Sequence, residues 1–167
     1  MKKVLLAILA FVLCFSFVAC ANYDREQYRA DVLDCQNSII AASKNLNQIY
    51  CYMGGYWMGA KNKDGTINDP DSMVVSALDN ASVDPGFDIV DAMSKITEKH
   101  GKVSEISVSG DDKEIKMYID LMYDEYCNLS TLIISPKGTQ KIWNSNVYDS
   151  TNKINDYSEE ILRLTAS

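Results

Sequence analysis

The chain has 167 residues and a net charge of -7 at pH 7, from 16 basic and 23 acidic residues. This length is typical of one domain with its own hydrophobic core. An acidic chain without a basic patch argues against nucleic-acid binding and against electrostatic attachment to anionic lipids. We therefore expect no nucleic-acid partner.

The first twenty residues have the three parts of a secretory signal. Lys2 and Lys3 precede an apolar run from Val4 to Ala19, which has small residues near its end and is followed by Cys20. This run is shorter than the ~20 apolar residues that a spanning helix needs. We expect residues 1–20 to be an export signal and residues 21–167 to be a single helical domain.

Val18-Ala19-Cys20 resembles the end of a bacterial lipobox, with Phe17 where that motif usually has leucine. The resemblance implies a lipoprotein in which Cys20 carries acyl chains such as palmitate and becomes the N-terminus on the extracytoplasmic face of the membrane. Two acyl chains give stable anchoring, whereas one gives only marginal binding. Ala19-Cys20-Ala21 also fits an ordinary signal peptidase site, with cleavage after Ala21 and a secreted or periplasmic product.

Residues 23–59 are predicted to form one long helix. Apolar side chains follow a spacing of three and four residues, which is the seam of a bundle helix: Val32, Cys35, Ile39, Ala42, Leu46, Ile49, Met53 and Tyr56. The opposite, polar face is expected to carry Asp31, Ser38, Asn45 and Gln48.

The end of this helix is rich in aromatic residues and methionine, around the pair Gly54-Gly55. The residues concerned are Tyr50, Tyr52, Met53, Tyr56, Trp57 and Met58. They are expected to cap one end of the core, and the alternative is a ligand pocket or a partner patch.

The middle of the chain is predicted to hold a loop over residues 60–70 and two short helices. The first covers residues 71–81, and the second begins at Asp84-Pro85, since aspartate and proline are common at helix starts. Lys99-His100-Gly101 is expected to end the second helix, because cations favour the last turn and glycine follows it. Residues 103–109 alternate apolar and polar side chains and are expected to be an extended linker.

Two long helices are predicted to complete the chain. The first spans residues 110–134, with Ser109 as its cap and an apolar seam at Ile115, Ile119, Met122, Tyr126, Leu129 and Ile133. The second begins at Pro136 and has its seam at Trp143, Val147, Ser150, Ile154, Tyr157, Ile161 and Leu164. The short connection between them predicts an antiparallel hairpin.

These elements predict an all-α fold, an antiparallel four-helix bundle with its second helix broken into two short pieces. The alternative is a three-helix bundle with a helical cap. Cys51 and Cys127 precede the ends of the first and third helices by similar distances, so we expect these two thiols to form a disulfide if the helices run parallel. Cys35 is then left reduced on the seam.

No catalytic motif, cofactor motif or metal-ligand spacing follows the signal. Asp120 and Asp124 share a helix face, but His100 is the single histidine and its spacing from Glu98 fits no di-metal bundle site. We expect no enzyme, no cofactor and no metal. The favoured hypothesis is a lipid-anchored binding module with an unknown protein or small-molecule partner. The alternative is a soluble helical protein that binds a small apolar ligand between its helices near residues 50–58.

Overall fold

The computed structural model describes residues 24–67 and 69–166, which form five helices. They are α2 (Arg25–Ala60), α3 (Pro70–Asn80), α4 (Ile89–Ser104), α5 (Asp112–Ile134) and α6 (Gln140–Thr165). The extended contacts within the described residues are two isolated bridges, Lys61 with Ile67 and Thr66 with Thr139. The predicted all-α class is confirmed, although the structure has five separate helices where four were expected. The predicted signal and Cys20 lie outside the described residues.

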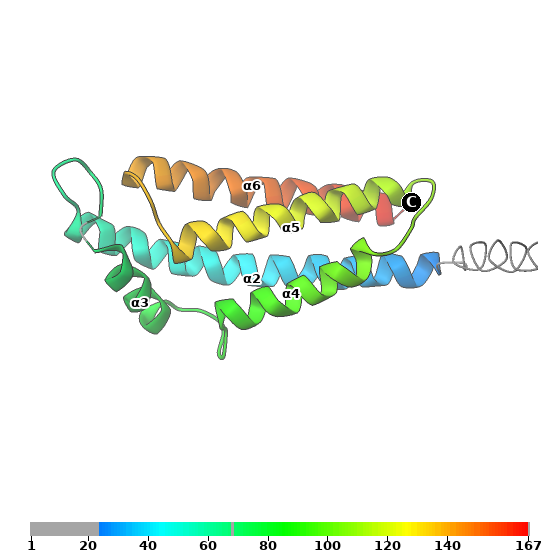
Figure 1. The fold of residues 1–167 in the computed structure, drawn as a ribbon, viewed down its shortest axis with the longest axis horizontal. Helices are drawn as coiled ribbons and strands as arrows, with labels where there is room; N and C mark the ends of the chain where they lie inside the picture. The colour runs from blue at the N-terminus through cyan, green and yellow to red at the C-terminus, as the bar shows by residue number, and fades with distance from the viewer. Residues whose placement is uncertain (1–23, 68, 167) are drawn as a thin grey trace, which may run out of the picture.

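Helix α2 is the centre of the molecule, because it contacts each of the other helices. Figure 1 shows α2, α5 and α6 side by side along the long axis, with α4 along the first half of α2 and α3 near its end. Helices α5 and α6 form the antiparallel hairpin that the sequence predicts. Helices α2 and α5 also pack directly on one another.

The core consists of the predicted seams. On α2 the buried apolar side chains are Tyr28, Val32, Cys35, Ile39, Ala42, Leu46, Ile49, Met53 and Trp57. The last step is therefore from Met53 to Trp57, and Tyr56, which was expected on the seam, is half-buried. Every predicted seam residue of α5 is buried, and so is every one of α6 except the half-buried Tyr157.

Helix α4 differs from its prediction at both ends. It begins at Ile89, capped by Asp88, whose carboxylate accepts a hydrogen bond from the Asp91 amide at 2.8 Å. The expected cap, Asp84, instead bonds to Asn45 of α2. At the other end α4 continues through Gly101 to Ser104, so residues 103 and 104 of the expected linker are helical.

Burial explains why α4 passes Gly101. Ile89, Ile96 and Val103 are spaced by seven residues and all are buried, so the final turn places an apolar side chain in the core. Lys116 of α5 donates hydrogen bonds to the carbonyls of Val103 and Ser104, which satisfies acceptors that a helix end leaves free.

The starts of α5 and α6 also differ from the prediction. Helix α5 has Asp111 rather than Ser109 as its cap residue, after Gly110 at a φ of 58°. Helix α6 begins at Gln140 rather than Pro136, because Gly138 turns the chain at a φ of 82° and Thr139 caps the helix. None of the described helices has an apolar stretch long enough to cross a bilayer.

One end of the molecule is tied by a buried carboxylate. Asp112, at the start of α5, accepts hydrogen bonds from Arg25 Nε at 3.1 Å and Arg29 Nε at 3.0 Å. Arg29 Nη1 also donates to the carbonyl of Thr165 at 3.1 Å. The start of α2, the start of α5 and the end of α6 are thereby joined.

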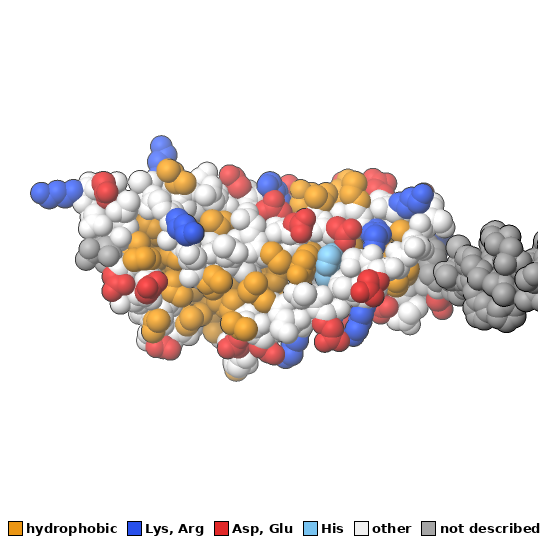
Figure 2. All heavy atoms as spheres, viewed as in Figure 1, with side chains coloured by type: hydrophobic (Ala, Val, Ile, Leu, Met, Phe, Trp, Pro, Cys, Tyr) orange, Lys and Arg blue, Asp and Glu red, His pale blue; other side chains and the backbone are white. Residues whose placement is uncertain are grey.

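The surface carries exposed apolar side chains as well as charged ones. Figure 2 shows apolar side chains gathered over α3 and the neighbouring part of α4, with acidic and basic side chains around them. Val75 and Leu78 of α3 and Val90 of α4 are among the exposed ones. This area lies near the end of the molecule where α2 finishes.

Candidate functional site

The aromatic end of α2 is divided between core and surface. Met53 and Trp57 are fully buried, whereas Tyr50, Tyr52 and Tyr56 are half-buried and Met58 is 67% exposed. These six side chains therefore do not converge on one pocket.

Trp57 and Trp143 fill this end of the bundle. Their rings stack with centroids 5.0 Å apart, and Tyr50 packs on Trp143 at the same distance. Trp57 Nε1 donates to the carbonyl of Gly65 and Trp143 Nε1 to that of Leu132, at 3.2 and 2.8 Å. Buried indoles with satisfied N–H groups are typical of structural core residues.

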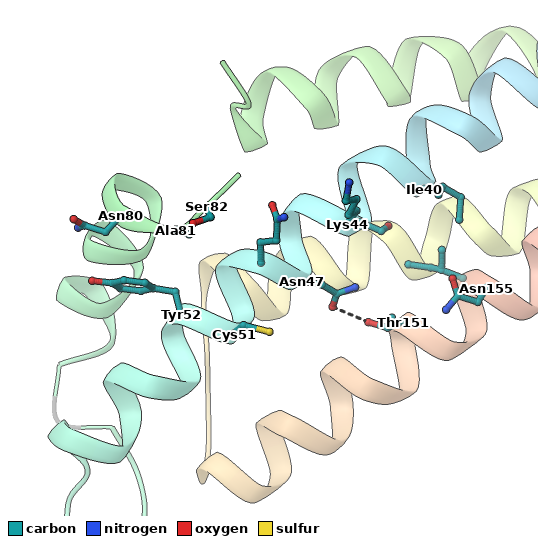
Figure 3. A pocket seen from close by; sticks show the side chains of 13 residues that line it. Ile40, Lys44, Asn47, Cys51, Tyr52, Asn80, Ala81, Ser82, Thr151 and Asn155 are labelled. Atoms are coloured by element: carbon teal, nitrogen blue, oxygen red, sulfur yellow. Dashed lines mark hydrogen bonds between the residues drawn. The ribbon is translucent and has the colours of Figure 1, made fainter. Parts of the chain in front are cut away.

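An open groove lies over the flank of α2, between the end of α3 and the middle of α6 (Figure 3). Its volume is about 730 Å³. The floor consists of one continuous face of α2, where residues recur at helical spacing: Ile40, Ser43, Lys44, Asn47, Gln48, Cys51 and Tyr52. Residues 80–82 after α3 form one wall, and Thr151, Ile154 and Asn155 of α6 form the other.

The lining of the groove is rich in neutral hydrogen-bonding groups. Four primary amides line it, those of Asn47, Gln48, Asn80 and Asn155. Among the described residues, Lys44 is the single charged side chain of the lining, and none of the others is aspartate or glutamate. The chain has 23 acidic residues, so a lining without carboxylates differs from the rest of the molecule. Such a lining is unsuitable for a cation.

Hydrogen bonds hold both walls to the floor. Thr151 Oγ1 donates to Asn47 Oδ1 at 3.2 Å, and the hydroxyls of Tyr52 and Ser76 share a hydrogen bond of 3.2 Å. Asn47 Nδ2 thus remains available as a donor. These contacts fix the distance between the walls and α2, so the groove is formed without a ligand.

Asn45 sets the position of the loop beside the groove. It is 3% exposed, accepts a hydrogen bond from the Asp84 amide at 2.7 Å and donates to Asp84 Oδ2 at 3.0 Å. The sequence placed Asn45 on the polar face of α2, which is wrong, because the connection from α3 to α4 covers it. This clamp keeps residues 81–88 against α2.

Two oxygens at the groove floor have no hydrogen-bond partner among the described residues, Ser43 Oγ and Gln48 Oε1. Ser43 is 5% exposed. A helical serine commonly donates to the carbonyl four residues earlier, as Ser38 does to Asp34 at 2.8 Å, but Ser43 does not. An unsatisfied buried polar group is costly, so this floor has unused hydrogen-bonding capacity.

The three described cysteines are free thiols. The expected bond between Cys51 and Cys127 is not formed, because the two side chains face different parts of the molecule. Cys51 is exposed in the groove, whereas Cys127 is half-buried beside Tyr123, whose ring stacks on His100 of α4. Cys35 is buried on the α2 seam, as expected, and burial raises its pKa to about 12.

His100 has a partner that its sequence neighbours did not suggest. Its Nε2 lies 2.8 Å from Asp120 Oδ1, and its ring stacks on Tyr123 with centroids 4.0 Å apart. The Tyr123 hydroxyl in turn shares a hydrogen bond with Thr97 at 2.9 Å. These groups join α4 to α5 and do not line the groove.

The two acidic residues considered for catalysis do not converge. Asp120 is occupied by His100, and Asp124 is exposed on the next turn. Within residues 24–67 and 69–166 there is no cluster of three His, Cys, Asp or Glu side chains able to hold a metal ion. The groove is thus the candidate site. Sequence reasoning missed it, apart from Tyr52, because its three parts come from distant segments.

No known protein family matches this chain, and neither the curated proteins nor the solved structures compared with it gave a match.

Proposed function

We propose that this protein is an extracytoplasmic, lipid-anchored binding module without enzymatic activity, and that its ligand occupies the groove on α2. In this proposal α3 and α4 together take the second position of an antiparallel four-helix bundle. The break between them leaves one flank of α2 uncovered. The groove supports the proposal best, because it is preformed, is lined by hydrogen-bonding side chains and includes the unpartnered Ser43 oxygen.

The position of the groove along α2 fits a role above a membrane. Helix α2 begins at Arg25, five residues after Cys20. With a rise of 1.5 Å per residue, the floor from Ile40 to Tyr52 lies about 20–40 Å along the helix from its start. A ligand in the groove would be well outside the headgroup layer of a bilayer to which Cys20 is anchored.

The anchor is tested by the mass and the detergent partitioning of the protein expressed in bacteria. We expect the mature chain to begin at an acylated Cys20 and to enter the detergent phase, and a Cys20→Ala variant to remain aqueous. An unmodified N-terminus at Asn22 would contradict the lipid anchor and favour the secreted or periplasmic alternative.

The ligand site is tested with a variant that fills the groove. Asn47→Trp places an indole over the floor, so it should abolish binding of any ligand that the wild-type protein retains. Asn37→Trp, on an exposed position of the same helix outside the groove, is the matched control. Equal binding by both variants would place the site elsewhere. The alternative site at residues 50–58 has less support, since Trp57 and Trp143 fill that end.

A further inference from the structure

We propose that the groove ligand is a short peptide segment that carries a carboxylate, held by the amides of the lining and by Lys44. This inference names the ligand class of the site described above and so rests on the proposed function.

The dimensions of the groove suit a short peptide. A volume of about 730 Å³ is within the range of ~300–1,000 Å³ found for ligand sites. The floor from Ile40 to Tyr52 is about 18 Å long at 1.5 Å per residue. An extended chain rises about 3.3 Å per residue, so roughly five residues would span this floor.

The amides of the lining match the peptide group. Each primary amide has both donor N–H groups and an acceptor oxygen, and each peptide unit offers one donor and one acceptor. Asn47 and Gln48 lie on the floor, whereas Asn80 and Asn155 are on opposite walls. Asn47 Nδ2 is free to donate, because the Thr151 bond uses its oxygen. Gln48 Oε1 and Ser43 Oγ are buried acceptors at the floor that have no hydrogen-bond partner among the described residues.

Lys44 indicates a negative charge on the ligand. Its ammonium group forms no ion pair with any residue that the structure describes, and no acidic residue lines the groove. Seven of the other thirteen described lysines and arginines form ion pairs, such as Lys99 with Asp34 at 2.7 Å and Lys153 with Glu125 at 2.7 Å. Among the described lysines without an ion pair, Lys44 is the one that lines the groove. A carboxylate on the ligand would complete the same kind of pair.

A saccharide fits this lining less well. Sugar sites commonly combine stacking aromatic rings with carboxylates that accept from sugar hydroxyls. Within the described part of the chain, the lining has no carboxylate and one aromatic residue, Tyr52. The hydroxyl of Tyr52 is already bonded to Ser76. The apolar part of the lining, at Ile40, Ala81 and Ile154, instead suits small aliphatic side chains on a peptide.

Cys51 provides the assay, because its exposed thiol lines the groove. The full chain in detergent is alkylated with iodoacetamide, and peptide mapping follows Cys51 and Cys127 separately. The probes are acetyl-Ala-Ser-Gly-Ser-Ala with a free carboxylate, the same peptide as its C-terminal amide, maltopentaose and trigalacturonic acid. We expect the acidic peptide to slow alkylation of Cys51 and to leave Cys127 unchanged.

The charge is tested with Lys44→Gln, for which Lys141→Gln on an exposed site outside the groove is the matched control. Losing a charge-assisted hydrogen bond in an open site should weaken binding of the acidic peptide about three- to tenfold. The amide form should bind K44Q and wild type equally. Because Lys44 is exposed, the substitution should not affect folding.

The remaining outcomes show whether the ligand class or the binding site itself is wrong. If the acid and amide peptides protect Cys51 equally, and Lys44→Gln does not change this, the requirement for a carboxylate on the ligand is wrong. The groove would remain a binding site. Protection by a saccharide and by neither peptide would overturn the ligand class alone. Absence of protection by all four probes would overturn the inference, and a ligand insensitive to Asn47→Trp would separately overturn the proposed function.

Discussion

Asp112 is the charged residue on which one end of the bundle depends. Its side chain is 1% exposed and pairs with Arg29, which is 15% exposed, and with the more open Arg25. Asp112→Asn keeps the shape but leaves Arg29 without its counter-charge, so we expect a loss of about 2–4 kcal/mol in unfolding free energy. Urea denaturation followed by tryptophan fluorescence measures it. Asp124→Asn, on an exposed site of the same helix, should change stability little.

Cys35 makes the stability of the fold sensitive to alkaline pH. Burial raises its pKa from 9.0 to about 12, so between these values the unfolded chain has lost a proton that the folded chain retains. The unfolded state therefore binds fewer protons, and stability falls as pH rises through this window. Tyr126, whose pKa burial raises from 10.0 to about 12, acts in the same direction.

Cys35→Ala removes the thiol contribution and so tests it. From pH 8 to pH 10 the wild-type chain should lose about 1 kcal/mol more unfolding free energy than the variant. Chemical denaturation at both pH values gives the difference. A constant difference between the two proteins would show that the Cys35 thiol titrates normally in the folded state.

Single residues differ in how far the sequence predicts them. Most seam residues were predicted correctly, because burial of a helix stripe follows largely from local spacing, although Tyr56 and Tyr157 are half-buried. Asn45 was misplaced because its burial depends on a loop 39 residues away. The same holds for His100, whose partner Asp120 is on another helix and 20 residues distant.

At the scale of elements, Gly101 and Gly138 have opposite effects on helix stability. Gly101 is inside α4, and a Cβ there would meet no atom within 4 Å, whereas Gly138 has a φ of 82°. Gly101→Ala should raise stability by about 0.5–1 kcal/mol, since alanine favours the helix. Gly138→Ala should lower it, because an L-residue is strained there. Thermal unfolding of the two variants gives the sign; equal signs would contradict these assignments.

The Asn45 clamp is a second prediction at this scale. Asn45→Ala removes both hydrogen bonds to Asp84 and leaves the backbone N–H of Asp84 without its acceptor. We expect residues 81–88 to exchange amide hydrogen faster and stability to fall by about 1–3 kcal/mol. Hydrogen exchange followed by mass spectrometry measures the loop. Asn37→Ala, at an exposed position of α2, is the control. Uniformly faster exchange in every helix would mean a global rather than local effect.

Helix boundaries were predicted less well than helix seams. Asp84-Pro85, Ser109 and Pro136 all have the chemistry of a helix start, yet α4, α5 and α6 begin later. Asp88 and Thr139 cap α4 and α6 with side-chain hydrogen bonds, whereas Asp111 at the start of α5 makes no such bond. Several competent caps in one short segment cannot be ranked without the tertiary contacts, and these contacts decide which one is used.

For the whole molecule, the class could be predicted and the site could not. Periodic seams over long segments predict an all-α protein whatever the packing partners are. The groove instead depends on the break between α3 and α4 and on the distance between α6 and α2. Neither can be predicted from a local sequence pattern. Tyr52 was singled out as aromatic, but its hydroxyl bonds to Ser76 of α3 and its side chain lines the groove together with Asn80.

The contacts of Arg25 and Arg29 with Asp112 have a mechanical consequence. Under the proposed anchor, a pulling force on a bound ligand would be transmitted along α2 to its first turn, next to Cys20. There the guanidinium groups couple α2 to α5 and to the last turn of α6. A force along the helix axis would then shear three helices together rather than peel one away. The end of the molecule next to the proposed anchor would then resist tension through the contacts of all three helices.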